Sequence, residues 1–333
     1  MPNFEEPTWL ILTVYLVAGF VLLAKGADWL VGGSSGLARR LGVSVLAIGL
    51  TVVAWGTSAP EVVVSSLAAY QGQSAISLGN VLGSNVANIG LVLGACAIVL
   101  PGVLEQRLRA REMSWLFASL IALWVACADG SLVREEAALL LGLFLIYNAI
   151  LFITARREPA PKYEQLDTSS TGKDLGLTLL GMVGVVLGAK LVVMGAEGGA
   201  LRLGVDQRVV GLTVVAIGTS LPELAAGLGG AFKGETDISI GNVVGSNVFN
   251  VLAVLGIVGL VRPLDAASMP TPEAVTELNA AFAGALSKDF YIVLGFSLAA
   301  VLLPYLGGAR GGRLKGFALL LAYGIYSASL FTE

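Results

Sequence analysis

Histidine is absent from this chain of 333 residues, and only 13% of its residues are charged. Without imidazole, the chain lacks the side chain that most often serves as a general base, a proton relay or a metal ligand. A net charge of −3 argues against a nucleic-acid partner. The only two cysteines, Cys96 and Cys127, lie in apolar runs, which favours buried thiols over a disulfide or a metal pair.

Apolar residues dominate what remains. The chain is 56% hydrophobic with a mean hydropathy of +0.84, values outside the balance of a soluble domain. We therefore expect an all-α integral membrane protein. The N-terminal stretch carries Glu5 and Glu6 where a signal peptide needs positive charge, so we expect the first apolar run to be retained as a span.

About ten apolar runs are long enough to cross the hydrocarbon layer of a bilayer. The expected spans are Trp9–Leu30, Val43–Tyr70, Ala75–Val99, Met113–Ala128, Glu136–Ala155, Leu175–Arg202, Val209–Phe232, Ile238–Val261, Phe290–Leu306 and Leu314–Phe331. A polar segment from Asp265 to Lys288 is expected to form a loop or a surface helix. Lysine and arginine are concentrated in alternate loops, which predicts that both termini are extracytoplasmic.

The chain repeats itself. The segment Thr51–Gly94 aligns without a gap on Thr213–Gly256, and about half of the positions are identical. An odd number of expected crossings separates the two copies, so they face opposite ways. Inverted repeats with interrupted helices indicate a secondary transporter whose site lies between the repeats. We expect a first repeat at residues 1–155, a short cytoplasmic linker at 156–174 and a second repeat at 175–333.

Each copy places a proline and a carboxylate inside an apolar run, as GTSAPE at 56–61 and GTSLPE at 218–223. Ser58 and Ser220, each three residues before a glutamate, spell a capping box, so one interpretation is a simple helix start. However, a buried carboxylate at membrane depth costs several kcal/mol and usually serves a function. Glu61 and Glu223 are therefore candidate cation ligands facing a polar cavity.

The second half of each copy supplies further oxygens, in GNVLGSNVAN at 79–88 and GNVVGSNVFN at 241–250. Residues four apart share a helical face, which groups Ser84 with Asn88 and Ser246 with Asn250 as candidate ligands. The remaining asparagines of these motifs are expected to form hydrogen bonds between helices. They are Asn80, Asn85, Asn242 and Asn247.

The combined set of carboxylates, amides and hydroxyls, including those of Thr57 and Thr219, contains only oxygen donors. Such a set suits Ca²⁺ better than Zn²⁺ or Cu²⁺. Na⁺ also seeks oxygen ligands, so mutually exclusive binding of the two ions would suit an antiporter.

The paired GTSxPE and GNVxGSNVxN motifs resemble the alpha repeats of the Na⁺/Ca²⁺ exchanger family. The resemblance covers nearly the whole chain and implies two inverted halves of five spans, with spans 2, 3, 7 and 8 broken around a midplane site. It also implies a mechanism in which the first and sixth spans slide across the others. The implied ligands of Ca²⁺ and Na⁺ are Glu61, Glu223, Thr57, Ser58, Thr219, Ser220, Ser84, Ser246, Asn88 and Asn250, with backbone carbonyls at Ala54 and Ala216.

The expected function is Na⁺/Ca²⁺ antiport in the cell membrane, with no cofactor and no obligatory protein partner. Some members of the family have an aspartate at one of the two central positions, whereas Asn88 and Asn250 are both amides. This difference leaves an H⁺/Ca²⁺ exchanger and a K⁺-dependent exchanger as alternatives. A channel is favoured less because inverted repeats suit alternating access. An enzyme is least favoured because no catalytic constellation accompanies the glutamates.

Overall fold

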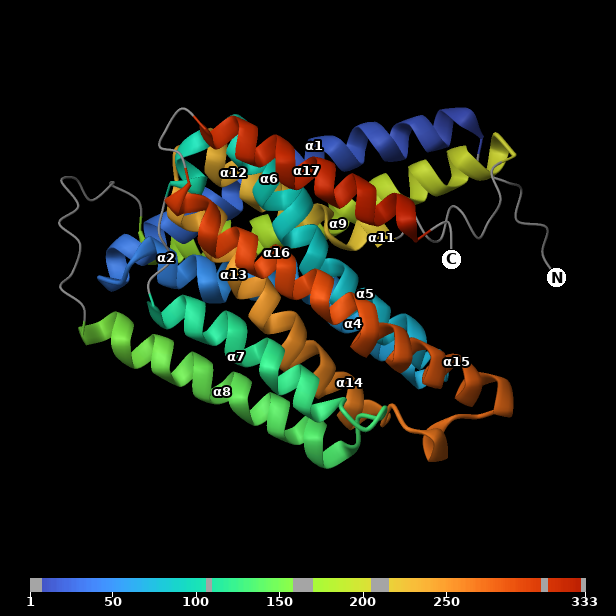
Figure 1. The fold of residues 1–333 in the computed structure, drawn as a ribbon. Helices are drawn as coiled ribbons and strands as arrows, with labels where there is room; N and C mark the ends of the chain where they lie inside the picture. The colour runs from blue at the N-terminus through green and yellow to red at the C-terminus, as the bar shows by residue number, and fades with distance from the viewer. Residues whose placement is uncertain (1–7, 106–109, 158–169, 205–215, 307–310, 331–333) are drawn as a thin grey trace.

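The computed structural model describes residues 8–105, 110–157, 170–204, 216–306 and 311–330. Helices account for nearly all of this part of the chain (Figure 1), with one isolated antiparallel bridge between Leu132 and Leu264. The long helices and helical pairs are α1 Trp9–Leu41, α4 Ala59–Tyr70, α5 Ser74–Ala87, α6 Gly94–Val99, α7 Ala110–Ala126, α8 Arg134–Arg157, α9 Thr171–Arg202, α12 Leu221–Phe232, α13 Thr236–Phe249, α14 Leu255–Val261, α15 Pro272–Gly284, α16 Phe290–Leu302 and α17 Gly312–Ser329. Short helices α2 Val45–Ile48, α3 Ala54–Thr57 and α11 Ala216–Thr219 precede the two GTSxPE breaks.

Six helical stretches within the described residues are long and apolar enough to span a bilayer, and a bent pair makes a seventh. The bent pair joins Val45–Thr57 to Ala59–Tyr70 at 44°. The chain is therefore a multi-pass membrane protein, while the full count of ten spans stays a prediction. Two spans are longer than expected: the first continues to Leu41, and the polar segment before the ninth is helical from Pro272, so that one helical stretch runs from Pro272 to Tyr305.

The centre of the bundle is formed by α5–α6 and α13–α14, whose spanning windows are 78% and 83% buried. Both stretches are continuous helices, but each contains a π-helical turn, at Asn88–Leu93 and Asn250–Val254. Each of these spans therefore departs from α geometry by one extra residue in a single turn, and not by a non-helical break. The helix α13 passes so close to the π turn at 49–53 that a Cβ at Gly245 would lie only 2.5 Å from the carbonyl oxygen of Leu50.

The two longest helices, α1 and α9, pack antiparallel along one side of the bundle (Figure 1). Glycines repeat every seven residues on both facing surfaces. They are Gly19, Gly26 and Gly33 on α1 and Gly181, Gly188 and Gly195 on α9. A Cβ at Gly181 would lie 2.3 Å from the backbone nitrogen of Leu30, so the two backbones meet at a distance that only glycine permits.

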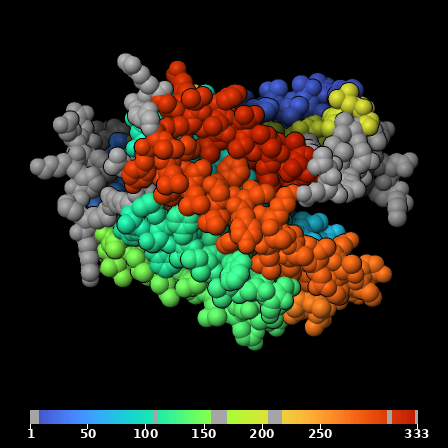
Figure 2. Space-filling model, in the orientation of Figure 1, coloured from blue at the N-terminus to red at the C-terminus, as the bar shows by residue number. Residues whose placement is uncertain are grey.

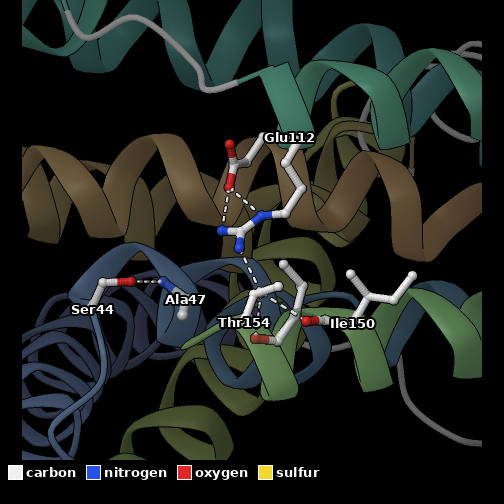
Figure 3. Close-up of polar contacts among 7 residues, drawn as sticks. Ser44, Ala47, Glu112, Ile150 and Thr154 are labelled. Atoms are coloured by element: carbon white, nitrogen blue, oxygen red, sulfur yellow. Dashed lines mark hydrogen bonds and ion pairs between the residues drawn. The ribbon is translucent and has the colours of Figure 1, made fainter. Parts of the chain in front are cut away.

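An ion pair at the start of α7, between Arg111 and the buried Glu112, is hydrogen-bonded to α8 (Figure 3). Glu112 is 2% exposed, and its Oε1 accepts hydrogen bonds from Arg111 at 2.6 and 3.0 Å. The same guanidinium donates from Nη1 to Thr154 on α8 at 2.5 Å. Burying this charge is tolerated because it is paired and hydrogen-bonded.

On the face shown in Figure 2, α15, α16 and α17 lie over the central helices beside α7. The outward side of α17 is apolar, with Leu314, Phe317, Leu321 and Ile325 all more than half exposed. A large exposed apolar surface of this kind is stable against lipid rather than water. Cys96 and Cys127 are free and buried, which confirms the expectation for the thiols.

Candidate functional site

Each GTSxPE motif forms a break between two helices. In the first copy, α3 ends at Thr57 and α4 begins at Ala59, with Pro60 in the first turn of α4. In the second copy, α11 ends at Thr219 and α12 begins at Leu221, with Pro222 in the equivalent place. Proline lacks an N–H group and fits the first turn of a helix.

The interpretation of each motif as a capping box is wrong. Neither Ser58 nor Ser220 makes a side-chain cap bond to its helix. The Ser58 hydroxyl instead donates to Oε1 of Glu223 at 2.7 Å, which links the two repeats. The hydroxyl of Ser58 therefore bonds to the other repeat and does not cap α4.

The two glutamates lie together in the interior. Glu61 and Glu223 are both 0% exposed, and their carboxylates are close enough to interact electrostatically. Within the described part of the chain, neither carboxylate oxygen of Glu61 has a hydrogen-bond partner, and Oε2 of Glu223 also has none. Three buried carboxylate oxygens without protein partners form an unstable arrangement unless a cation or a proton compensates them.

The threonines of the motifs connect these breaks to the central helices. Thr57 on α3 donates to Oδ1 of Asn242 on α13 at 3.0 Å, and Asn242 donates to the backbone oxygen of Glu223 at 3.2 Å. Thr219 makes the matching contact to Oδ1 of Asn80 on α5, at 3.5 Å. The threonine–asparagine contact therefore occurs in both repeats, whereas the bond from asparagine to the backbone of a glutamate is found at Glu223 and the amide of Asn80 donates to Ser65 instead.

Ser65 was missed by the sequence analysis. Its hydroxyl accepts a hydrogen bond from Asn80 at 2.9 Å, and its carbonyl accepts one from Ser77 at 2.5 Å. It lies four residues after Glu61, on the same helical face, which was the available signal. The second repeat has Gly227 at this position, where only the backbone contact remains, from Ser239 at 2.7 Å.

Four asparagines lie where α5 crosses α13. Asn85 and Asn247 donate to each other's backbone oxygens at 3.4 Å, and Asn88 donates to Oδ1 of Asn247 at 3.0 Å. The expected interhelical role is thus confirmed for Asn80, Asn85, Asn242 and Asn247. Asn250 is 0% exposed, and neither its amide oxygen nor its amide nitrogen has a partner among the described residues.

The other candidate ligands line the same region. Ser84 is buried beside Glu61, and Ser246 is buried with an unpaired hydroxyl, as is Ser220. The carbonyl of Ala54 accepts the N–H of Ser58 at 3.0 Å and the hydroxyl of Thr57 at 3.3 Å. Ala216 is the first residue of α11, and its side chain lies outside the described residues.

The chemistry of this region is that of hard cations. Its donors are carboxylate, amide, hydroxyl and carbonyl oxygens from both repeats, without nitrogen or sulfur ligands. Ca²⁺ takes six to eight oxygen ligands and tolerates irregular geometry, so the set fits it well. Two adjacent carboxylates also match the charge of one divalent ion.

Comparison with known proteins gives a match along the whole chain. The family described as "Sodium/calcium exchanger protein" matches residues 11–153 and 173–332. The chain is 37% identical to the "Putative antiporter CaxA" of Alkalimonas amylolytica, over 97% of this chain and 100% of that protein. It is 33% identical to the "Inner membrane protein YrbG" of Escherichia coli (strain K12), over 97% of each.

Solved structures give the same result. The sodium-calcium exchanger NCX_Mj, soaked with 10 mM Na⁺ and zero Ca²⁺, superimposes with a TM-score of 0.76 at 34% sequence identity. The match covers 97% of this chain and 100% of that one, so it includes both inverted repeats.

Proposed function

Because the chain belongs to the sodium/calcium exchanger family, we propose that it exchanges Na⁺ for Ca²⁺ at the site between Glu61 and Glu223. The family is one of transporters. The observation that carries the proposal is the pair of fully buried carboxylates, one from each repeat, with three oxygens that no described residue satisfies. Ca²⁺ would compensate both charges at once, and Na⁺ would need more than one ion to do so.

The ion ligands that we propose are those expected from the sequence. The glutamates would bind Ca²⁺ directly, and hydroxyl, amide and carbonyl oxygens would complete the shell. The full set is Glu61, Glu223, Thr57, Ser58, Thr219, Ser220, Ser84, Ser246, Asn88 and Asn250, with the carbonyls of Ala54 and Ala216. Asn250 is supported by its two unpaired polar atoms in the interior.

Access to this site would alternate between the two faces of the membrane by movement of α1 and α9 as one body. Their glycine-lined contact supports a rigid pair. In the two inverted repeats, α1 corresponds to α9 and α4 corresponds to α12. The contact between α1 and α12 is therefore the counterpart of the contact between α9 and α4. The first contact is extensive, whereas α9 makes at most marginal contact with α4. This difference is what a transporter closed on one side and looser on the other would have.

We place the protein in the cell membrane, or the inner membrane where there are two, with both termini outside. The lysine and arginine distribution supports this orientation. The domain division is proposed as a first repeat to residue 155, a linker at 156–174 and a second repeat from 175. Lipid is the expected surroundings, and neither a cofactor, a nucleic acid nor a protein partner is part of the proposal.

Coupling to H⁺ or K⁺ is not favoured by the family match. The amides Asn88 and Asn250 do not change this preference, because Ca²⁺ accepts the carbonyl oxygens of asparagine as well as carboxylates.

The test is Ca²⁺ uptake into proteoliposomes that contain Na⁺, compared with matched interiors of K⁺ or choline. We expect uptake only with internal Na⁺ and no stimulation by external K⁺. Uptake that follows an imposed pH gradient and ignores Na⁺ would identify an H⁺/Ca²⁺ exchanger. Absence of Ca²⁺ movement under every condition would refute the substrate assignment.

A further inference from the structure

The turn between α12 and α13 is attached to α1 by two ion pairs. Lys233 contacts Oδ1 of Asp28 at 2.8 Å and also donates to the backbone oxygen of Asp28 at 2.6 Å. Glu235 accepts a hydrogen bond from Arg39 at 2.9 Å. We call these two pairs, Asp28–Lys233 and Arg39–Glu235, the α1 clamp.

The two α1 members of the clamp lie on one face of the helix. They are 11 residues apart, which is about three turns and about 16 Å along the axis. The α12–α13 turn lies between them, near Gly32, where an added Cβ would be 3.3 Å from Nζ of Lys233. A shift of α1 in one direction stretches the Asp28–Lys233 pair, and a shift in the other stretches the Arg39–Glu235 pair. Together the pairs resist axial displacement both ways.

The turn itself is well fixed. Gly234 has a φ of +73°, a left-handed conformation that favours glycine. The N–H of Glu235 donates to the carbonyl of Gly230 at 2.8 Å, which closes the turn onto α12. Lys233 and Glu235 are therefore fixed to α12 and α13, whereas Asp28 and Arg39 would move with α1 and α9.

A third ion pair has a different character. Arg40 on α1 binds Asp174 on α9 at 2.6 Å, with side chains only 19% and 5% exposed. The clamp pairs are more exposed, at 55% and 34% for Asp28 and Lys233 and at 36% and 23% for Arg39 and Glu235. Exposed pairs exchange readily with water, whereas buried pairs do not. The more buried Arg40–Asp174 pair therefore holds α1 to α9 more firmly, and the more exposed clamp pairs break and re-form more readily.

The clamp lies beside an apolar contact between α1 and α12. A Cβ at Gly229 on α12 would lie 3.1 Å from Cβ of Ala27 on α1, so the two helices pack closely there. A groove of about 430 Å³ opens along this contact, and Asp28 and Lys233 are among the residues that line it. The Asp28–Lys233 pair therefore joins the two helices across the groove, next to their apolar contact.

The clamp has no equivalent in the other repeat. The alignment of Gly26 with Gly188 and of Thr51 with Thr213 places Lys190 and Leu201 at the positions of Asp28 and Arg39. It places Gln71 and Gln73 at the positions of Lys233 and Glu235. The α4–α5 turn is attached instead to the segment after α14, through a hydrogen bond from Arg262 to the carbonyl of Tyr70 at 2.9 Å.

We propose that the α1 clamp is a one-sided latch, which stabilises the conformation with α1 closed against α12 over the conformation with the opposite side closed. The inference rests on the alternating access described under the proposed function. Because only one repeat carries the latch, the two conformations of an otherwise symmetric fold differ in free energy. Each exposed pair would change their population ratio about twofold to fivefold.

The test uses distances rather than transport, so it does not depend on the identity of the ions. Spin labels are placed at the exposed residues Leu41 on α1 and Leu145 on α8, after Cys96 and Cys127 are replaced by alanine. Pulsed electron paramagnetic resonance then gives the distance distribution in nanodiscs without Na⁺ or Ca²⁺. We expect Lys233→Glu to lower the population of the distance seen in the parent protein, and the double variant Asp28→Lys with Lys233→Glu to restore it.

The matched control is Lys190→Glu, at the symmetry-related position on α9, which has no ion pair among the described residues. It should leave the distribution unchanged. Raising choline chloride from 0.1 M to 1 M, without Na⁺ or Ca²⁺, should imitate Lys233→Glu in the parent protein, because salt screens exposed pairs. An unchanged distribution in Lys233→Glu, or an equal change in Lys190→Glu, would overturn the latch. Either result would leave the Na⁺-dependent Ca²⁺ uptake test unaffected.

Discussion

The two repeats have similar sequences but different contacts. Ser58 of the first repeat donates to Glu223, whereas the hydroxyl of the equivalent Ser220 has no partner among the described residues. Asn88 is hydrogen-bonded to Asn247, whereas the equivalent Asn250 is not bonded within the described chain. On the larger scale, α1 packs along α12 while α9 hardly contacts α4.

These differences separate two kinds of contact. Contacts that occur in both repeats, such as those of Thr57 with Asn242 and Thr219 with Asn80, are compatible with every conformation of the fold. A contact present in only one repeat belongs to the conformation seen here, unless the sequences differ at that point. A chain of two inverted repeats that adopts one of two conformations related by the pseudo-two-fold axis must show such differences.

The largest loss of transport should come from replacing either glutamate, and the two replacements should have equal effects. Glu61→Gln and Glu223→Gln each remove one of the two carboxylates that would compensate a bound Ca²⁺, a change that should weaken Ca²⁺ binding by about 3 to 5 kcal/mol. This corresponds to a loss of about 150- to 5,000-fold in Na⁺-dependent Ca²⁺ uptake by proteoliposomes at low Ca²⁺. Glu197→Gln, on α9, is the control and should retain uptake. If Glu61→Gln or Glu223→Gln kept more than a tenth of the parent rate of uptake, the two glutamates would not share one ion site.

The glycine contact tests whether α1 and α9 form one unit. Gly181→Ala places a Cβ within 2.3 Å of the Leu30 backbone and should destabilise the protein by about 1 to 3 kcal/mol. Gly176→Ala lies on the same helix with nothing within 4 Å and should be neutral or slightly stabilising. Thermal unfolding in detergent, followed by tryptophan fluorescence, compares the two. Equal melting temperatures would show that the close contact does not contribute.

The asparagine crossing should respond unequally to equal substitutions. Asn247→Ala removes two side-chain hydrogen bonds, from its own amide to Asn85 and from Asn88 to its oxygen, whereas Asn85→Ala removes one. With about 0.6 to 1.7 kcal/mol for each bond between membrane helices, Asn247→Ala should cost about twice as much. Denaturation by increasing SDS measures the difference. A larger effect of Asn85→Ala would contradict the network described here.

The smallest effect should separate Ser58 from Ser220. Ser58→Ala removes a hydrogen bond to a carboxylate, which should cost about 1 to 2 kcal/mol without bound ions, whereas Ser220→Ala should cost less than about 0.5 kcal/mol. Both hydroxyls are proposed ligands, so saturating Ca²⁺ should make the two variants more alike. Melting temperatures with and without Ca²⁺ provide the comparison. A difference that persists or grows with Ca²⁺ would count against equivalent roles in the ion shell.

Much of the fold was predictable because membrane-spanning helices have long apolar sequences. The repeat alignment also identified Glu61 and Glu223, since a carboxylate is conspicuous in an apolar run. The partner of Ser58 was not predictable, because its capping-box pattern is local and the true acceptor lies 165 residues away. The continuation of α1 to Leu41 was missed because the glycines and serines after Leu30 suggest a helix end in water, whereas here they pack against α9 and its neighbours.

The π-helical turns at Asn88–Leu93 and Asn250–Val254 affect how the sequence of this protein can vary. A π turn holds one residue more than an α turn, so it resets the rotational phase of the helix that follows it. The half before the turn presents Ser84 to the interior, while the half after it presents Gly94 to the backbone of Gly316 on α17. Because the turn already accommodates one extra residue, deleting one residue within it would restore α geometry and leave the second half facing nearly the same partners. Deleting one residue from the α-helical part of either helix would instead rotate everything beyond it by about 100° against its partners. A deletion should therefore be tolerated better within the π turns than in the α-helical parts of these two central helices.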